Sequence, residues 1–232
     1  MSIFDRSLLK LRRARAAKIG FADVLHAHAA GEVQERLREV NRTLPEQRIV
    51  GGWTAPWTAV LPDLIPVADE DVLALDAESA DFILHALSLH SHSDPVGQLI
   101  QCRQALRPDG LFLGVLFGGR SLHELRACLA EAEIEQTGGL SPRVHPMGDL
   151  RDLGALMQRA GFAMPVADTQ TLTLTYPSLM ALMHDLRAMG ETNVQSDRHG
   201  PLTPSLLVQS EALYRARYGL EDNRLAATVE IV

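Results

Sequence analysis

Two histidines and a carboxylate stand close together in the segment His90-Ser91-His92-Ser93-Asp94. Such side chains can form the two-histidine, one-carboxylate triad that holds non-haem iron. A short pattern of this kind in a predicted loop is a weak metal signal. We therefore predict no metal site, and we expect His90 to line a substrate entrance or to have a structural role.

A pair of acids, Asp69 and Glu70, follows the apolar segment 64–67. A carboxylate at the end of a strand is able to accept hydrogen bonds from a ligand. The alternative is that Asp69, Glu70 and Asp71 form an acidic turn in solvent. From these residues alone, the solvated turn is the simpler interpretation.

Glu124 and Arg126 lie in a predicted helix over residues 121–136. Residues two apart on a helix point in different directions, so these two side chains cannot both face one ligand atom. Ser121, three residues before Glu124, completes a capping-box pattern. One interpretation of Glu124 is therefore purely structural.

The elements that position these side chains begin with one βαβ unit. Residues 82–87 and 111–117 are short, nearly continuous apolar runs, as in strands buried on both faces of a parallel sheet. The apolar spacing over 95–106 predicts a helix between them. Arg107-Pro108-Asp109-Gly110 predicts the turn into the second strand, and we expect a right-handed crossover.

Further elements extend this unit in both directions. We predict an N-terminal helical arm over residues 1–40, a strand over 48–51, a helix over 150–160, a strand over 169–176, helices inserted over 177–218 and a last strand over 226–232. Strands that alternate with helices predict a three-layer α/β sandwich, here a single domain of residues 1–232. Ligands in such sheets bind at the carboxyl ends of the strands.

Composition limits the function. The 232 residues are 46% hydrophobic and carry a net charge of −7, which argues against broad nucleic-acid binding. No apolar run reaches the roughly 20 residues of a transmembrane helix, and no secretory signal is visible. Cys102 and Cys128 form no paired motif. We predict a cytoplasmic protein, and we interpret the basic residues 1–20 as a solvated helix face rather than as a targeting segment or an anchor for an acidic partner.

Several segments together resemble a known family. The chain resembles class I S-adenosylmethionine (SAM)-dependent methyltransferases, within the branch of the biotin-pathway malonyl-carrier-protein methyltransferase and the mitochondrial complex I assembly factor described as an arginine hydroxylase. The combination FGG-x-[ST]-L-x-E-L-R with R-x-M-G-E-T-N is the most specific part. The matching segments are 68–75, 81–94, 106–126, 138–147, 152–162 and 173–193.

This resemblance implies a Rossmann-like fold and SAM as cofactor. It implies that Asp69 accepts a hydrogen bond from the adenine amino group, and that Leu87 and Ser88 lie beside the sulfonium. It also implies that Glu124 holds a cationic substrate such as arginine. The implied cofactor-binding residues are Gly51, Gly52, Asp69, Glu70, Leu87 and Ser88, and the implied substrate-binding residues are His90, Glu124, Arg126 and Arg143.

One segment departs from the family pattern. The family's glycine motif after the first strand is replaced by Gly51-Gly52-Trp53-Thr54-Ala55-Pro56-Trp57, and its leading acid is absent. A parallel neighbour needs a crossover of a dozen or more residues, so the chain lacks room for the usual elements. We predict that a strand and a helix are missing near residues 48–66. The two indoles then fill the vacated volume or, alternatively, one stacks on adenine.

Three functions follow from these observations. The first is a SAM-dependent methyltransferase-like enzyme that acts on a protein or carrier-protein substrate. The second is a cofactor-deficient relative that serves as an assembly or scaffold factor of the respiratory complex I type. The third is a protein arginine hydroxylase. We identify no catalytic residue, because alignment of the two reactants carries much of the barrier reduction in methyl transfer.

Overall fold

The computed structural model describes residues 2–40, 42–197 and 200–232. The chain forms two compact units. The sheet unit contains residues 23–117, 148–169 and 231–232, and the helical unit contains the described residues up to 22 together with 118–147 and 170–230. That residues 1–232 form a single domain remains a prediction.

The sheet unit is built on four parallel strands. They are β1 (Gln47–Val50), β2 (Leu64–Val67), β3 (Ala80–Ala86) and β4 (Leu106–Val115), in the order β2-β1-β3-β4. Strand β2 lies on one side of β1, and the next strand in the chain, β3, lies on the other side of β1. The crevice outside the carboxyl ends of β1 and β3 is therefore the expected ligand position in such a sheet.

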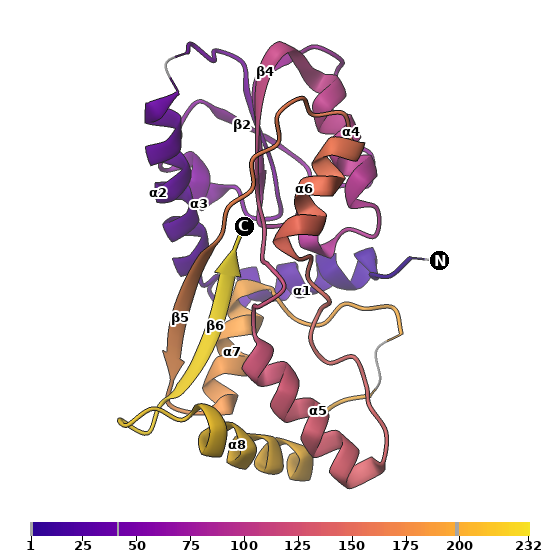
Figure 1. Cartoon of the computed structure of the whole chain (residues 1–232), viewed down its shortest axis with the longest axis vertical. Coiled ribbons are helices and arrows are strands. Elements are labelled where there is room, and N and C mark those ends of the chain that lie inside the picture. The colour runs from indigo at the N-terminus through magenta and orange to yellow at the C-terminus, as the bar shows by residue number, and fades with distance from the viewer. Residues whose placement is uncertain (1, 41, 198–199) are drawn as a thin grey trace. The chain divides into compact units, whose positions relative to one another are not determined.

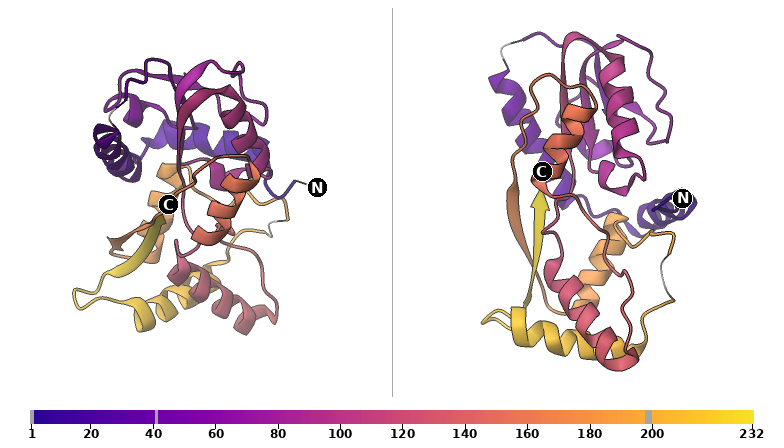
Figure 2. Two further views of the ribbon diagram at one scale, coloured as in Figure 1. Left: turned by 45° about the horizontal axis from the view of Figure 1, so that its top comes forward. Right: turned by 45° about the vertical axis from the view of Figure 1, so that its right-hand side comes forward.

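Helices cover both faces of this sheet. Helices α2 (Val24–Glu39) and α3 (Ala55–Thr58) lie on one side, and α4 (Pro95–Ala105) and α6 (Leu150–Arg159) lie on the other (Figures 1 and 2). A short 3₁₀ helix, η1 (Leu89–Ser91), joins β3 to α4. The predicted three-layer α/β arrangement is confirmed. Its core includes Val50, Ile83, Leu99, Cys102 and Phe112.

The connection from β1 to β2 is as short as the sequence predicts. Between Val50 and Leu64 the only helix is α3, which has four residues. No additional strand lies between β1 and β2, which pair directly from Gln47 with Leu64 to Val50 with Val67. Residues 48–66 therefore hold fewer elements than a full crossover followed by a second strand would require.

The predicted turn at residues 107–110 lies inside a strand. Strand β4 begins at Leu106, which pairs with Ala80, and the next printed pair joins Phe82 to Leu111. The four residues between form a bulge, with Asp109 at a φ of 65°. The prediction that the strand starts at Leu111 is wrong because Leu106 already pairs with β3.

The helical unit has its own elements and core. It contains α1 (Arg6–Ile19), α5 (His123–Thr137), α7 (Leu179–Met189), α8 (Pro204–Tyr218), β5 (Gln170–Tyr176) and β6 (Leu225–Ile231), the last through Glu230. Strands β5 and β6 form a separate two-stranded sheet, and their arrows run in opposite directions (Figure 1). Helices α5 and α8 pack together, as do α1 and α7. The helices predicted over 177–218 are thus present, and the two predicted helices of the N-terminal arm are α1 and α2.

Candidate functional site

Buried polar side chains gather where β2 and β3 end in the sheet unit. We call them the polar cluster: Asp69, His85, Ser88, His90, Ser91, His92 and Gln98. Burying polar groups costs free energy unless they bond to one another, so a group of seven at one edge needs an explanation. The edge is also where a parallel sheet of this type places its ligand.

Asp69 and His92 form the closest contact in the polar cluster. His92 Nε2 lies 2.5 Å from Asp69 Oδ1, and the two side chains are 2% and 3% exposed. The solvated-turn interpretation is therefore wrong for Asp69, although the neighbouring Glu70 and Asp71 are exposed. The carbonyl oxygen of Glu70 accepts a hydrogen bond from Gln98 Nε2 at 2.9 Å.

His85 is the most deeply buried histidine of the cluster. Burial lowers its pKa to about 4, helped by the neighbouring His92 and opposed by the negative charge of Asp69. The rings of His85 and His92 meet edge to face with centroids 6.0 Å apart. Its Nδ1 lies 3.3 Å from the Ser88 hydroxyl. His85 is therefore neutral at physiological pH.

The three side chains of the possible iron triad do not converge. His92 bonds to Asp69, whereas His90 packs its ring on Phe117 with centroids 4.9 Å apart. Asp94 is exposed and caps α4 by accepting a hydrogen bond from the Gly97 amide at 2.8 Å. Within the described ranges, no group of three or more His, Cys, Asp or Glu side chains is placed to hold a metal ion.

The two glycines predicted to bind the cofactor differ in burial. Gly51 is buried at the end of β1, and a Cβ placed there would lie 2.8 Å from the carbonyl oxygen of Ala86. Only glycine therefore allows this approach of β1 to β3. Gly52 is exposed. Leu87 is buried with a φ of 42°, and it precedes the buried Ser88, so four of the six implied cofactor residues are buried at this edge.

Trp57 fills space beside this edge. Its side chain is fully buried on α3, and its Nε1 donates a hydrogen bond to His26 Nδ1 on α2 at 2.9 Å. A buried indole of this kind has no exposed face on which adenine could stack, so the stacking interpretation fails for Trp57. Trp53 is half-buried.

Glu124 lies in the helical unit and is buried by β6. Its carboxylate accepts hydrogen bonds from the Thr228 amide at 3.1 Å and from the Thr228 hydroxyl. The capping-box prediction is wrong, because residue Leu122 occupies the N-cap position in a left-handed conformation. Ser121 instead donates to the carbonyl oxygen of Glu230 at 3.1 Å, since the backbone of β6 offers better-placed partners.

Arg143 and Arg126 also bond within the helical unit. Arg143 donates to Glu133 at 2.6 Å and to the carbonyl oxygen of Gly200 at 2.6 Å. Burial alone would raise the pKa of Glu133, but hydrogen bonds from Arg143 and Ser141 outweigh it and lower the pKa to about 2. Arg126 donates to the carbonyl oxygen of His145 at 3.3 Å.

Two of the segments that resemble the family, 138–147 and 173–193, are joined by hydrogen bonds at their ends in this unit. The Val194 amide donates to His145 Nε2 at 3.0 Å, and Asn193 donates to the carbonyl oxygen of Pro142 at 2.6 Å. The sequence patterns predict no role for Glu133, His145 or Thr228. No local spacing points to them, because their partners lie far away in the chain.

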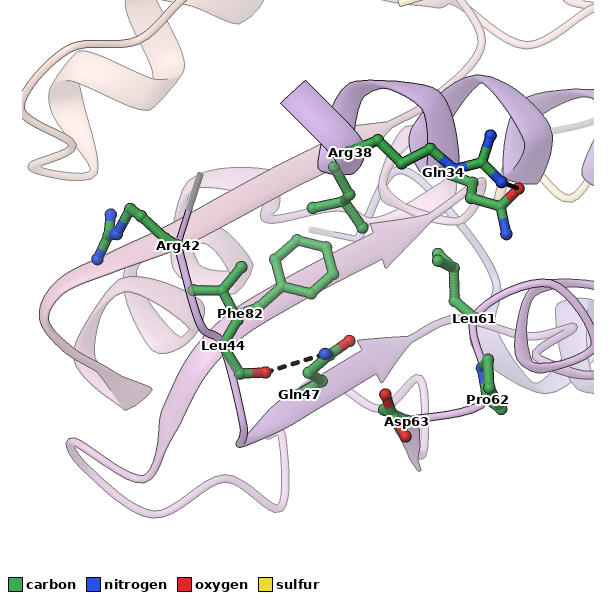
Figure 3. A pocket seen from close by; sticks show the side chains of 10 residues that line it. Gln34, Arg38, Arg42, Leu44, Gln47, Leu61, Pro62, Asp63 and Phe82 are labelled. Atoms are coloured by element: carbon green, nitrogen blue, oxygen red, sulfur yellow. Dashed lines mark hydrogen bonds between the residues drawn. The ribbon is translucent and has the colours of Figure 1, made fainter. Parts of the chain in front are cut away.

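A cavity of about 330 Å³ opens at the other end of the parallel strands (Figure 3). Leu44 and Phe82 lie beside each other in it, and Arg42 points away from the ring. The lining residues are Gln34, Leu37, Arg38, Arg42, Leu44, Gln47, Leu61, Pro62, Asp63 and Phe82. None of the predicted site residues lines this cavity, which lies at the amino ends of β1 and β2.

No helix in the described part of the chain combines the length and the apolar character that crossing a membrane requires. The net charge of −7 is unevenly placed, with six basic residues and one acidic residue in positions 1–20.

Comparisons with known proteins place these features in context. No family model matches the chain. Arginine-hydroxylase NDUFAF5 of Danio rerio is 31% identical over 261 residues, which cover 100% of this chain and 81% of that protein. The Homo sapiens protein of the same name is 31% identical over 260 residues, covering 100% and 75%. Malonyl-[acyl-carrier protein] O-methyltransferase of Halorhodospira halophila is 32% identical over 225 residues, covering 96% and 66%.

A solved structure resembles the chain in fold. The YcgJ protein of Bacillus subtilis superposes with a TM-score of 0.52 at 11% identity, covering 88% of this chain and 95% of that one. At this identity the likeness concerns the fold alone. Together with the relatives, it confirms the predicted Rossmann-like α/β class and the resemblance stated from the sequence.

Proposed function

The chain belongs to the methyltransferase-fold family that includes arginine-hydroxylase NDUFAF5 and malonyl-[acyl-carrier protein] O-methyltransferase, and on this premise we propose that it is a SAM-dependent methyltransferase-like enzyme. Its substrate is a protein or a carrier protein, as the name of the second relative states for that enzyme. The observation that carries the proposal is the buried Asp69 at the carboxyl end of β2.

The residues at this edge fit the chemistry of an adenosyl group. Asp69 is an acceptor-only side chain that suits the amino group of adenine. Gly51 lets the backbone of β1 pass close to β3, and Leu87 and Ser88 stand at the end of β3. SAM, when bound, supplies an electrophilic methyl group, and these residues would hold it and exclude water.

Of the four residues implied to bind substrate, one belongs to the polar cluster. His90 belongs to the polar cluster, whereas Glu124, Arg126 and Arg143 are bonded within the helical unit. Those bonds support a role in shaping the segments around them. Direct contact of these four residues with the substrate, and a cytoplasmic location, stay predictions.

Two measurements test this function. Isothermal titration calorimetry with SAM measures cofactor binding, and transfer of a radiolabelled methyl group from SAM to malonyl-loaded acyl-carrier protein, or to protein in a cell extract, measures activity. We expect micromolar binding that Asp69→Ala weakens at least tenfold, because a hydrogen bond to a charged group is lost (~1.5–3 kcal/mol). Absence of binding in a folded protein would contradict the proposal.

A second function is favoured by the short connection from β1 to β2. With Trp57 buried against His26 in place of a glycine motif, the chain also suits a cofactor-deficient assembly factor or an arginine hydroxylase, the activity named for its relatives. Mass spectrometry of an arginine-containing protein substrate, incubated with SAM, iron and a reductant in air, distinguishes these functions, and an unchanged substrate mass supports the assembly factor. Addition of one oxygen atom supports hydroxylation, and added methyl groups support methyl transfer.

A further inference from the structure

The cavity at the amino ends of β1 and β2 has no part in the proposed function. Its described lining residues all belong to the sheet unit, and none of them lies at the edge that carries Asp69. Its volume of about 330 Å³ falls at the lower end of the range for small-molecule sites, roughly 300–1,000 Å³. Since an apolar cavity of about 150 Å³ can hold benzene, this volume suits a single ring with a short chain.

Three leucines from different segments form the apolar part of this cavity. Leu37 lies on α2, Leu44 precedes β1, and Leu61 follows α3. All three are half-buried, whereas Phe82, which also lines the cavity, is fully buried. The leucines therefore keep apolar surface in contact with water, and a ligand that covers this surface gains the free energy of removing it from water.

One guanidinium group of the lining is held by a hydrogen bond and has no acid beside it. Arg38 donates to Gln34 Oε1 at 2.9 Å (Figure 3), and Gln34 Nε2 donates in turn to the carbonyl oxygen of Val60 at 3.0 Å. Arg38 is exposed and forms no ion pair with any residue that the structure describes. Its remaining N–H groups are therefore able to bind a carboxylate, and the existing bond reduces the entropy lost on binding.

The two other charged side chains of the lining differ from Arg38. Arg42 pairs with Asp109, Nη2 lying 3.1 Å from Oδ2, and it points away from the Phe82 ring (Figure 3). Asp63 is exposed on the other side of the opening from Arg38 and has no hydrogen bond to the described residues (Figure 3). Because Asp63 repels an acid placed near it, the acidic end of a ligand has to face Arg38.

We propose that this cavity binds a small carboxylic acid with an apolar body of about one ring, the carboxylate on Arg38 and the body against the three leucines. The inference does not rest on the proposed function, because the cavity and Asp69 lie at opposite ends of the parallel strands. An acid is favoured over an amine because Arg38 is held by Gln34, whereas Asp63 has no such support and would lose more entropy on binding.

The test titrates 4-phenylbutyrate and its neutral analogue 4-phenylbutyramide into the full chain, labelled with ¹⁵N and at the leucine methyl groups, and follows the NMR spectrum. We expect both probes to shift the resonances of Leu37, Leu44 and Leu61. The acid should bind about three- to fivefold more tightly than the amide, which is the gain expected from one ion pair at an exposed site.

Charge variants locate the bound carboxylate. Arg38→Gln should weaken 4-phenylbutyrate about three- to fivefold and leave 4-phenylbutyramide unchanged. Arg36→Gln is the matched control, because it removes the same charge from an exposed arginine of α2 that pairs with Asp168. It should change neither affinity by more than about 1.5-fold, since salt screens distant exposed charges. Asp69→Ala should also leave both affinities unchanged, which separates this site from the proposed cofactor site.

Results on the wild-type chain alone are able to overturn the proposal, so the test does not depend on the folding of a variant. They are no binding of 4-phenylbutyrate up to about 10 mM, equal affinities of the acid and the amide, shifts that map away from the three leucines, or tighter binding of the cation 4-phenylbutylamine than of the acid. A failure to bind SAM in the separate calorimetric titration would contradict the proposed function and leave this site standing.

Discussion

The two units bury acidic side chains in different ways. In the helical unit, Glu124 bonds to the backbone and hydroxyl of Thr228, and Glu133 bonds to Arg143 and Ser141. In the sheet unit, Asp69 bonds to a histidine. Arginine and backbone amides carry their protons at all accessible pH values, whereas a histidine can lose or gain one.

This difference separates acids that bond within the helical unit from an acid that lies at the expected ligand position. The carboxylates of the helical unit have permanent donors, so we expect their removal to cost stability. Asp69 bonds to His92 at the edge of the sheet where a ligand is expected, so we expect the main effect of its removal on binding. Three predictions test the comparison.

The largest effect on the free energy of unfolding is expected for Glu124→Ala. The change leaves the buried amide and hydroxyl of Thr228 without their acceptor, and we expect a loss of about 3 kcal/mol in the free energy of unfolding. Urea denaturation followed by circular dichroism measures it. Glu135→Ala, at an exposed position of the same helix, should change the value by no more than about 0.5 kcal/mol. A loss at Glu124 as small as that of the control would contradict a structural role.

A smaller loss, about 2 kcal/mol at pH 7, is expected for Glu133→Gln, which removes the charged partner of Arg143. The folded pKa of Glu133, about 2, lies below its ordinary 4.5. The stabilisation is therefore complete above pH 4.5 and is lost as pH falls toward 2. The difference between wild type and variant should shrink over that range, and a pH-independent difference would argue against the ion pair.

The smallest expected effect concerns His85 in the sheet unit. Its folded pKa, about 4, lies below its ordinary 6.5, so the unfolded chain binds a proton first as pH falls. The stability that neutral His85 contributes is complete above pH 6.5 and is lost toward pH 4. Relative to His85→Leu, the wild type should lose about 1 kcal/mol between pH 7 and pH 5.5. Parallel pH profiles of the two proteins would show that His85 titrates normally.

Most of the fold could be predicted because its elements leave local signals. The apolar runs 82–87 and 111–117, and the helix spacing between them, predict β3, α4 and β4 from neighbouring residues alone. The missing elements near residues 48–66 follow from counting residues. The bulge at 107–110 does not, because proline and an Asp-Gly pair indicate a turn whether it precedes a strand or interrupts one.

The candidate site was only partly predictable, because its bonds join distant residues. Asp69 was identified, but its partner His92 lies 23 residues away in sequence. Glu124 was identified with a local cap, whereas its actual partner Thr228 lies 104 residues away. The spacing of residues within a helix predicts only hydrogen bonds between neighbouring residues. It does not predict a bond from Glu124 to β6, because β6 lies far away in the sequence.

The buried pair of Trp57 and His26 gives the sheet unit an internal optical reporter. The chain has two tryptophans, so Trp53→Phe leaves Trp57 as the sole indole emitter. In the folded state its fluorescence should lie at short wavelength, because the ring is fully shielded from water. Separation of α2 from α3 would break the bond to His26 and shift the emission to the red. A single spectrum would then follow this edge of the sheet during ligand titration or unfolding.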